Sequence, residues 1–342
     1  MTGAVITKAA LPRLPAHAGF ALFRALGQQM ELPVVETDTD LSVQTANGEI
    51  ALRAQEGGIA LTLRAQDDIR LHALKQVIFA RLANLDPQVV PDWDHVATGA
   101  LPPNLATAHV ANITRISPHF SRVRVVGQGL QRFGDGGLHF RLLLAKQGRT
   151  PVWPRIGLDG RTVWPEGDDA LHRPVYTTRA FDPAGNWLDF DVFLHDGGRV
   201  TDWTHRAKAG DLVGLMGPSG SDIPQAEWVG LFGDETALPA VARILAALHH
   251  DTVGHAFVLL GDPADAQQLQ HPPGMVMHWL TRGGGGDLNA ALCSLTLPKT
   301  DRFVWFASET SEATAARTYL RDAQGFGRLH SNISGFWTAV AG

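Results

Sequence analysis

The sequence predicts three domains in succession: a small α+β module, an antiparallel β-barrel, and an α/β domain with a largely parallel sheet. Three patterns support this fold class. Helical periodicity flanks short strands in residues 1–95, short alternating strands fill residues 108–222, and strands alternate with helices over residues 226–342. A chain of 342 residues allows two or three domains at roughly 150 residues each.

The amino-terminal module is expected to contain two helices, because apolar residues recur at helical spacing in residues 16–30 and 68–85. Two or three short strands are expected between them, around residues 32–64. Proline and glycine are frequent in residues 87–93 and 98–104, which predicts a linker after the module. The result is a compact domain whose role the residues do not reveal.

The second region is typical of a small barrel, because short strands follow one another between turn signals. The best candidate is WLDFDVFLH (187–195), in which Leu188, Phe190 and Val192 alternate with polar residues. A long loop with several turn-forming residues is expected at 153–167. The six candidate strands cover residues 109–116, 121–126, 138–145, 173–180, 187–195 and 212–216.

The third region alternates apolar strands with helices, which is typical of a nucleotide-binding α/β sheet. Ligands of such sheets lie beyond the carboxyl ends of the strands. The expected strands are 227–232, 255–260, 275–280 and 302–307, with helices within 233–250 and over 311–323. The segments to search for a site are therefore 233–237, 261–263, 281–287 and 307–312.

Composition excludes several classes of function. The formal net charge is −5, the wrong sign for a dedicated nucleic-acid binder. The single cysteine, Cys293, cannot form an internal disulfide or ligate a four-cysteine metal cluster. No apolar run approaches the ~20 residues of a membrane span. Charges and prolines interrupt the amino-terminal apolar stretch, so we expect a cytoplasmic protein without a membrane span.

The segment RPVYTTR (173–179) is the strongest local sign of chemistry. A flavin site needs an aromatic face, a hydroxyl near the redox nitrogen, and a cation for the pyrophosphate. Tyr176, Thr177, and Arg173 or Arg179 supply these groups on one strand. The alternative is an ordinary strand whose tyrosine packs in the core.

From residue 108 to 338 the chain resembles the siderophore-interacting proteins, which are FAD-dependent ferric-siderophore reductases of the ferredoxin-reductase superfamily. The first ~90 residues look like a small domain of unknown function that is sometimes fused to these reductases. The motifs that carry the resemblance are HFSRVRVVG (119–127), HFRLLL (139–144), LDG and WP within 158–165, YTTRAFD (176–182), LDFDVFLH (188–195), AGDLVGLMGPSG (209–220), GDETALPAVARIL (233–245), VWFASE (304–309) and SGFW (334–337).

The resemblance implies FAD as cofactor, with Tyr176 and Thr177 at the isoalloxazine ring and Arg179 close by. The family's arginine two residues before the tyrosine is here Pro174, so Arg173 would reach the pyrophosphate only if the strand is bulged. GRVTDW (198–203) matches a helix start whose amides would receive phosphate. All residues expected to contact FAD or the nicotinamide nucleotide are Arg173, Tyr176, Thr177, Arg179, His195, Val200, Thr201, Trp203, Gly233, Asp234, Thr236, Ala237, Asp262, Glu309 and Trp337.

The electron donor implied by the resemblance is NADH or NADPH. Its nicotinamide would lie over the helix that starts at GDETALP (233–239), where Thr236 is expected to cap the helix and Pro239 to occupy its first turn. The alternative is a capped helix without a ligand. A carboxylate at Asp262 favours NADH, and an arginine at 243, 282 or 317 that reached the ribose would favour NADPH. Trp337 is a candidate cap over the nucleotide cleft.

The expected substrate is an anionic ferric siderophore, bound by Arg141 and Arg282 beside the flavin. No catalytic acid or base is expected, because the electrons pass through FAD, and no metal site is expected. An external electron carrier is a further candidate partner. Two alternatives stay open: a general NAD(P)H flavin or ferric reductase of the same superfamily, and a siderophore-binding protein without enzymatic activity.

Overall fold

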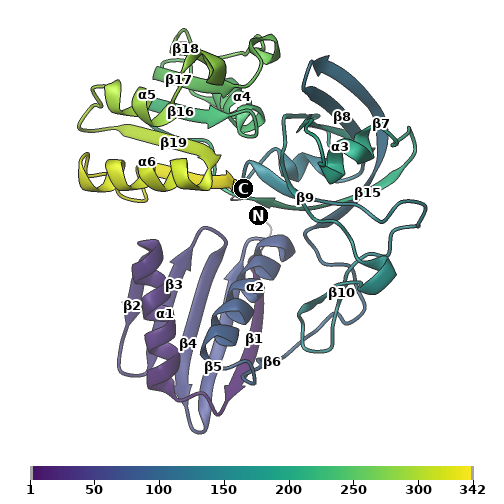
Figure 1. Ribbon diagram of the computed structural model, residues 1–342. Helices are drawn as coiled ribbons and strands as arrows, with labels where there is room; N and C mark the ends of the chain where they lie inside the picture. The colour runs from purple at the N-terminus through teal and green to yellow at the C-terminus, as the bar shows by residue number, and fades with distance from the viewer. Residues whose placement is uncertain (1–2, 340–342) are drawn as a thin grey trace. The chain divides into compact units, whose positions relative to one another are not determined.

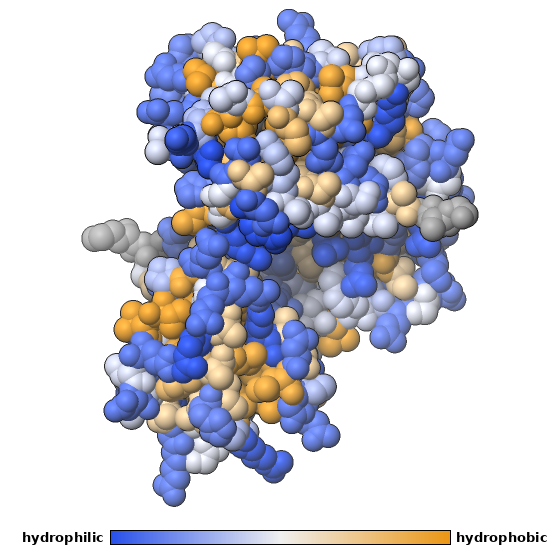
Figure 2. Space-filling view, turned by 60° about the vertical axis from the view of Figure 1, so that its left-hand side comes forward, coloured by the Kyte–Doolittle hydropathy of each residue, from blue (hydrophilic) through white to orange (hydrophobic). Residues whose placement is uncertain are grey.

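The computed structural model describes residues 3–339 and divides into two compact units (Figure 1). The first unit covers the chain up to Leu105 together with Ala145–Leu171. The second covers Ala106–Leu144 together with the chain from His172. Figure 2 shows hydrophilic and apolar residues interspersed over the visible face. Within residues 3–339, no helix is long and apolar enough to cross a membrane.

The first unit is built on a six-stranded antiparallel sheet in the order β2-β3-β4-β5-β1-β6, with two helices packed against its apolar face. Both helices have the bounds expected from periodicity. The first strand was missed, because Thr7 and Ala9 occupy two of its inward positions and weaken the apolar alternation. The elements are β1 (Val5–Pro12), α1 (Ala16–Met30), β2 (Val34–Glu36), β3 (Asp40–Thr45), β4 (Gly48–Gln55), β5 (Gly58–Ala65), α2 (Asp68–Leu85) and β6 (Asp92–Trp93).

The segment Ala145–Leu171 leaves the barrel and folds with the first unit; we call it the excursion. It carries β10 (Arg155–Ile156), β11 (Thr162–Val163) and a 3₁₀ turn. Ile156 exchanges backbone hydrogen bonds with Gly99 and Ala100, at 2.8 and 2.9 Å. The Arg161 guanidinium lies 5.2 Å from the centre of the Phe79 ring. The sequence predicted a loop here but not its packing on the amino-terminal module.

The barrel part of the second unit is a seven-stranded sheet in the order β12-β9-β15-β7-β8-β14-β13. The strand expected at 173–180 is in fact two short strands, because the chain turns after Thr177. The elements are β7 (Leu105–Ser117), β8 (Phe120–Gly127), β9 (His139–Leu143), β12 (Val175–Thr177), β13 (Ala180–Phe181), β14 (Trp187–Phe193), α3 (Arg199–Thr204) and β15 (Leu212–Ser219).

The α/β part is a five-stranded sheet in the order β18-β17-β16-β19-β20, and every neighbouring pair is parallel. Helix α5 and strand β20 were not expected, because both are short and lie in segments rich in polar residues or glycine. The elements are β16 (Trp228–Asp234), α4 (Leu238–Ala247), β17 (Val253–Leu260), β18 (Gly274–Thr281), α5 (Leu288–Ser294), β19 (Arg302–Glu309), α6 (Thr310–Asp322) and β20 (Ser331–Trp337).

Arg243 of α4 joins the two parts of the second unit. Its Nη1 donates to the carbonyls of Phe133, Leu138 and Thr178 at 3.0 to 3.3 Å. Its Nη2 donates to the carbonyl of Gly134 at 2.8 Å. Burial lowers the pKa of this side chain to about 10, so it stays charged at neutral pH. A buried cation thus satisfies four backbone acceptors of the barrel from a helix of the neighbouring sheet.

Replacing Arg243 with Met keeps the length of the side chain but removes every donor. Since hydrogen bonds from a charged group contribute about 1.5–3 kcal/mol each and buried acceptors would be left unsatisfied, we expect the variant to lose at least about 3 kcal/mol of stability. Thermal unfolding followed by calorimetry measures this loss. Arg321→Met is the control, because Arg321 is exposed and pairs only with its neighbour Asp322. Equal melting temperatures for the two variants would contradict the role given to Arg243.

Candidate functional site

A cavity of about 370 Å³ lies between the barrel strands and the carboxyl ends of the parallel sheet. Four of the residues expected from sequence line it together: Tyr176, Thr177, His195 and Thr236. The complete lining is His139, Val175, Tyr176, Thr177, Asp191, Phe193, His195, Thr236, Pro239, Ser334, Gly335 and Phe336. The cavity therefore receives side chains from both parts of the second unit.

Tyr176 and Thr177 come from β12 and form the barrel wall of the cavity. The ring of Tyr176 packs on Phe190, with 5.3 Å between the centroids. Burial raises the pKa of its phenol, so the hydroxyl stays protonated. The Thr177 hydroxyl lies 3.0 Å from Nδ1 of His139. An aromatic face and a hydroxyl thus stand side by side, as a flavin site requires.

Arg179 lies next to this wall in a buried network of charges. Its Nε is 3.6 Å from the Asp191 carboxylate, which also forms a two-point ion pair with Arg122. The hydrogen bonds to Asp191 raise the pKa of Arg122, whereas burial lowers that of Arg179. The Arg179 Nε is buried without a hydrogen bond. Arg179 itself does not line the cavity, although its ion-pair partner Asp191 does.

The segment after β14 brings together the next group of expected residues. The backbone N–H of His195 donates to Oγ1 of Thr201 at 3.2 Å. Gly198 leaves room for both, because a Cβ there would lie 2.7 Å from that oxygen and 2.9 Å from the His195 ring. Val200 is buried, and Trp203 packs on the barrel core. A helix does begin at residue 199, as expected, although it is only six residues long.

Arg173 precedes β12, and the strand contains no bulge at this point. The pairing of Thr177 with His139 and of Val175 with Arg141 continues in the same register to His172 and Leu144. The bulge that would bring Arg173 toward the pyrophosphate is therefore absent. The guanidinium of Arg141 reaches the carbonyl of Arg173, at 3.4 Å.

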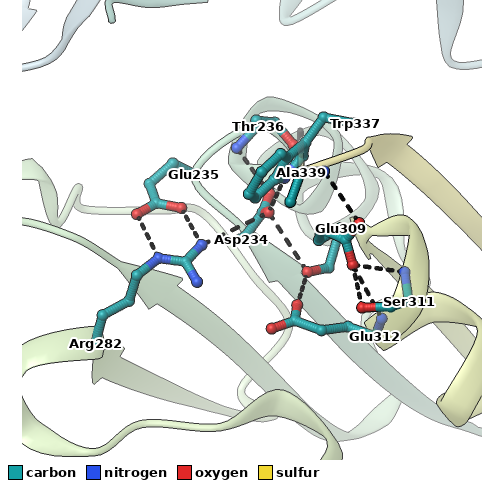
Figure 3. Close-up of polar contacts among 10 residues, drawn as sticks. Asp234, Glu235, Thr236, Arg282, Glu309, Ser311, Glu312, Trp337 and Ala339 are labelled. Atoms are coloured by element: carbon teal, nitrogen blue, oxygen red, sulfur yellow. Dashed lines mark hydrogen bonds and ion pairs between the residues drawn. The ribbon is translucent and has the colours of Figure 1, made fainter. Parts of the chain in front are cut away.

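The α/β wall is formed by the segment after β16 and by the end of β20. Figure 3 shows the polar contacts of the turn after β16. A Cβ on Gly233 would lie 2.8 Å from that of Ala237, so a glycine lets the end of β16 pack closely on the start of α4. Thr236 does not cap α4. The helix has Ala237 at its N-cap, without a side-chain cap, and the Thr236 hydroxyl donates to Oδ1 of Asp234 at 2.6 Å. Pro239 does lie in the first turn.

Asp234 is fully buried at the centre of a polar cluster that links three strand ends (Figure 3). Its Oδ2 accepts the indole N–H of Trp337 at 2.6 Å, and burial raises the pKa of its carboxyl. Arg282 donates to Glu235 at 2.8 Å and lies 3.7 Å from Asp234. Arg282 is thus held in this cluster by carboxylates, and no contact links it to Arg141.

Several residues that were expected to contact the nucleotide form hydrogen bonds with neighbouring groups of the chain. Glu309 is the N-cap of α6 and accepts the backbone N–H of Ser311 at 2.5 Å and that of Ala339 at 3.2 Å. Asp262 caps the 3₁₀ turn after β17. Arg243, one of the three arginines considered as a ribose contact, instead has its guanidinium bonded to barrel carbonyls. Arg317 donates to the carbonyl of Ile333 at 2.7 Å.

Pro239 was expected only at the helix start, and sequence reasoning missed seven further lining residues of the cavity: His139, Val175, Asp191, Phe193, Ser334, Gly335 and Phe336. His139 and Phe336 lie in motifs that were noticed for Arg141 and Trp337, one or two residues away. Asp191 and Phe193 were interpreted as strand positions only. Within residues 3–339, no group of three or more His, Cys, Asp or Glu side chains is arranged to hold a metal ion.

Two family models match most of the chain from residue 109 onward, the excursion included. Residues 109–222 match the siderophore-interacting FAD-binding domain, and residues 226–340 match the siderophore-interacting protein model. The chain is 30% identical over 220 residues to the ferric vibriobactin reductase ViuB of Vibrio cholerae, covering 60% of this chain and 79% of that protein. It is 31% identical over 207 residues to the NADPH-dependent ferric-chelate reductase of Escherichia coli, covering 58% and 80%.

Solved structures give the same result. The siderophore utilization protein from T. fusca has a TM-score of 0.60 and 28% identity, covering 72% of this chain and 97% of that one. The siderophore-interacting protein SipS from Aeromonas hydrophila has a TM-score of 0.57 and 25% identity, covering 69% and 99%. The expected order of an antiparallel flavin barrel and a parallel α/β domain is confirmed.

The residues at the cavity fit FAD, the cofactor named in the matching family model. Tyr176 offers a flat apolar face and the Thr177 hydroxyl offers a short polar contact. These are groups that an isoalloxazine ring needs.

The N-cap of α6 is expected to make the stability of the protein depend on pH. Its hydrogen bonds, chiefly with Ser311, lower the pKa of Glu309 to about 2 from an ordinary value of 4.5. The stability that ionised Glu309 supplies is therefore present above about pH 4.5 and is lost as the pH falls toward 2. We expect Glu309→Gln to melt below the wild type at pH 6, with a difference that shrinks as the pH falls from 4.5. Thermal unfolding of both proteins between pH 2.5 and 6 measures this, and a difference independent of pH would contradict it.

Proposed function

Because the chain belongs to the siderophore-interacting protein family, we propose that it is an FAD-dependent NAD(P)H:ferric-siderophore oxidoreductase. The observation that carries the proposal is the shared lining of one cavity. Tyr176 and Thr177 of the barrel face the same space as Thr236 and Phe336 of the α/β part. A flavin on the first pair and a nicotinamide beside the second would meet at van der Waals distance, which hydride transfer requires.

When bound, FAD accepts a hydride from NADH or NADPH and passes its two electrons singly to ferric ions. The chain's own residues hold, orient and shield the reactants. The Tyr176 ring supplies a face for stacking, while His195 and the start of α3 offer donors for the phosphates and adenosine. Gly233 and Ala237 allow the donor nucleotide to approach the turn after β16. No side chain has to move a proton for the iron to be reduced.

The substrate side of the proposal rests on charge. A ferric siderophore is usually anionic, and the whole chain carries a formal net charge of −5, so attraction has to be local. Arg141, on β9 beside β12, is the stronger of the two expected contacts, because Arg282 is already paired with Glu235. Fe(II) binds hard oxygen ligands less tightly than Fe(III), so reduction releases the iron.

The choice of donor nucleotide stays a proposal, as do a cytoplasmic location and an external electron carrier. The E. coli relative is named for NADPH. Here the Asp262 carboxylate, which favoured NADH, is engaged in capping a turn through the N–H of Ala264 at 2.8 Å. NADH and NADPH therefore have to be tested in parallel.

The direct test uses the purified full chain loaded with FAD under nitrogen. We expect the flavin bands to bleach on addition of NADH or NADPH and to return when a ferric siderophore is added, with Fe(II) trapped by a colorimetric chelator. Saturable reduction of free flavin but not of any ferric siderophore would favour the general reductase. Flavin that does not bleach with either nucleotide, in a chain that still binds siderophore, would favour the binding protein.

Arg141→Ala tests the substrate contact. Loss of one exposed charge near an anionic substrate weakens attraction by about 1 kcal/mol, so KM for the ferric siderophore should rise about fivefold. The rate of flavin bleaching by NAD(P)H and the FAD content should not change. Arg321→Ala removes an exposed arginine of α6 and serves as the matched control. A loss of FAD from the Arg141 variant would show that the residue belongs to the cofactor site instead.

A further inference from the structure

His139 faces Thr177 across two paired strands at the wall of the cavity. The two residues are partners in the register of β9 and β12, and both line the cavity. Nδ1 of the imidazole lies 3.0 Å from Oγ1 of the hydroxyl. This distance is that of a good hydrogen bond, so the orientation of the Thr177 hydroxyl depends on His139.

The imidazole is held in place from two further sides. The ring of Phe336 meets it edge to face, with 5.5 Å between the centroids and 79° between the planes. On another side stands Gly220, where φ is +87° and a Cβ would lie 2.5 Å from Cδ2 of His139. A side chain at this position would displace the ring, so glycine is required for the observed position of His139.

Burial sets the protonation state of the imidazole, and the nearby cation of Arg243 adds to its effect. Arg243 donates to the carbonyls of Leu138 and Thr178, the residues next to His139 and Thr177. Burial, with a contribution from this cation, lowers the pKa of His139 to about 4. At neutral pH the ring is uncharged and has one nitrogen that donates and one that accepts.

We propose that His139 is a positioning residue for electron transfer: its Nδ1 accepts the Thr177 hydroxyl proton and turns the oxygen's lone pairs toward the cavity. An oxygen in this orientation accepts a hydrogen bond from the N–H that a flavin ring carries only when it is reduced. The pair therefore binds reduced FAD more tightly than oxidised FAD. The inference rests on the proposed function, because it needs a flavin ring at Thr177.

A double-mutant cycle tests this proposal through the two-electron midpoint potential of the bound FAD, measured by equilibration with a reference dye at pH 7. The proteins are the wild type, His139→Phe, Thr177→Val and the double variant. We expect each single change to weaken the binding of reduced relative to oxidised FAD about tenfold, which lowers the potential by about 30 mV. The double variant should shift no further than Thr177→Val, because both residues act through one hydrogen bond.

Two conservative variants separate positioning from packing. His139→Asn places its amide near the position of Nδ1 and should retain the wild-type potential. His139→Gln places its amide farther out, near Nε2, and should shift the potential as His139→Phe does. In the FAD-free wild type, nitrogen NMR should show the His139 ring protonated at Nε2 and not at Nδ1.

The outcomes are distinct. An unchanged potential in His139→Phe, additive shifts in the cycle, or a proton on Nδ1 would overturn the role of His139 and leave the proposed reductase intact. If His139→Phe does not fold, the comparison of Asn with Gln decides: equal potentials would overturn the role. A wild-type chain that takes up no FAD would overturn both proposals.

Discussion

The guanidinium of Arg243 is the interaction on which the geometry of the second unit depends. It extends from α4 into the barrel and bonds to the carbonyls of Phe133, Gly134, Leu138 and Thr178. Leu138 and Thr178 precede and follow the two residues whose side chains meet at the cavity. One buried cation therefore sets the distance between the α/β sheet and the barrel and also fixes the strands that carry His139 and Thr177.

The absence of a carboxylate among these contacts matters physically. A buried ion pair would satisfy the arginine with one rigid partner, whereas four backbone acceptors spread the charge over two loops and a strand end. The cation also adds to the effect of burial, which is the larger cause of the low pKa of His139. Structural and electrostatic roles are thus combined in one side chain.

Much of the fold follows from sequence periodicity, and the parts that do not have physical reasons. Helices α1 and α2 were predicted to the residue, because their apolar faces repeat over four turns or more. Strand β1 was missed because its inward positions include Thr7, whose hydroxyl bonds to Asp94. That contact spans 87 positions of the chain and leaves no local signal.

The candidate site shows the same division. Tyr176, Thr177 and Thr236 could be found from motifs, and the cavity does bring them together. The roles of Arg243 and Glu309 could not be predicted. The sequence does not distinguish an arginine that bonds to backbone carbonyls, or a glutamate that caps its own helix, from a residue that contacts a ligand. No local sequence pattern marks His139 or Phe336 as a site residue. Their rings come into contact only in the folded protein, where β9 and β20 lie close together.

The excursion has a consequence for how the two units can be separated. The chain passes between them at Leu105 to Ala106, at Leu144 to Ala145 and at Leu171 to His172. A chain that begins at residue 106 would therefore still contain the excursion, which is part of the first unit. Its Ile156 would lack the backbone partners Gly99 and Ala100. The two units are therefore discontinuous in sequence and do not follow one another as two uninterrupted domains. A minimal reductase has to be built by shortening the loop between β9 and β12 as well as by removing the first 105 residues.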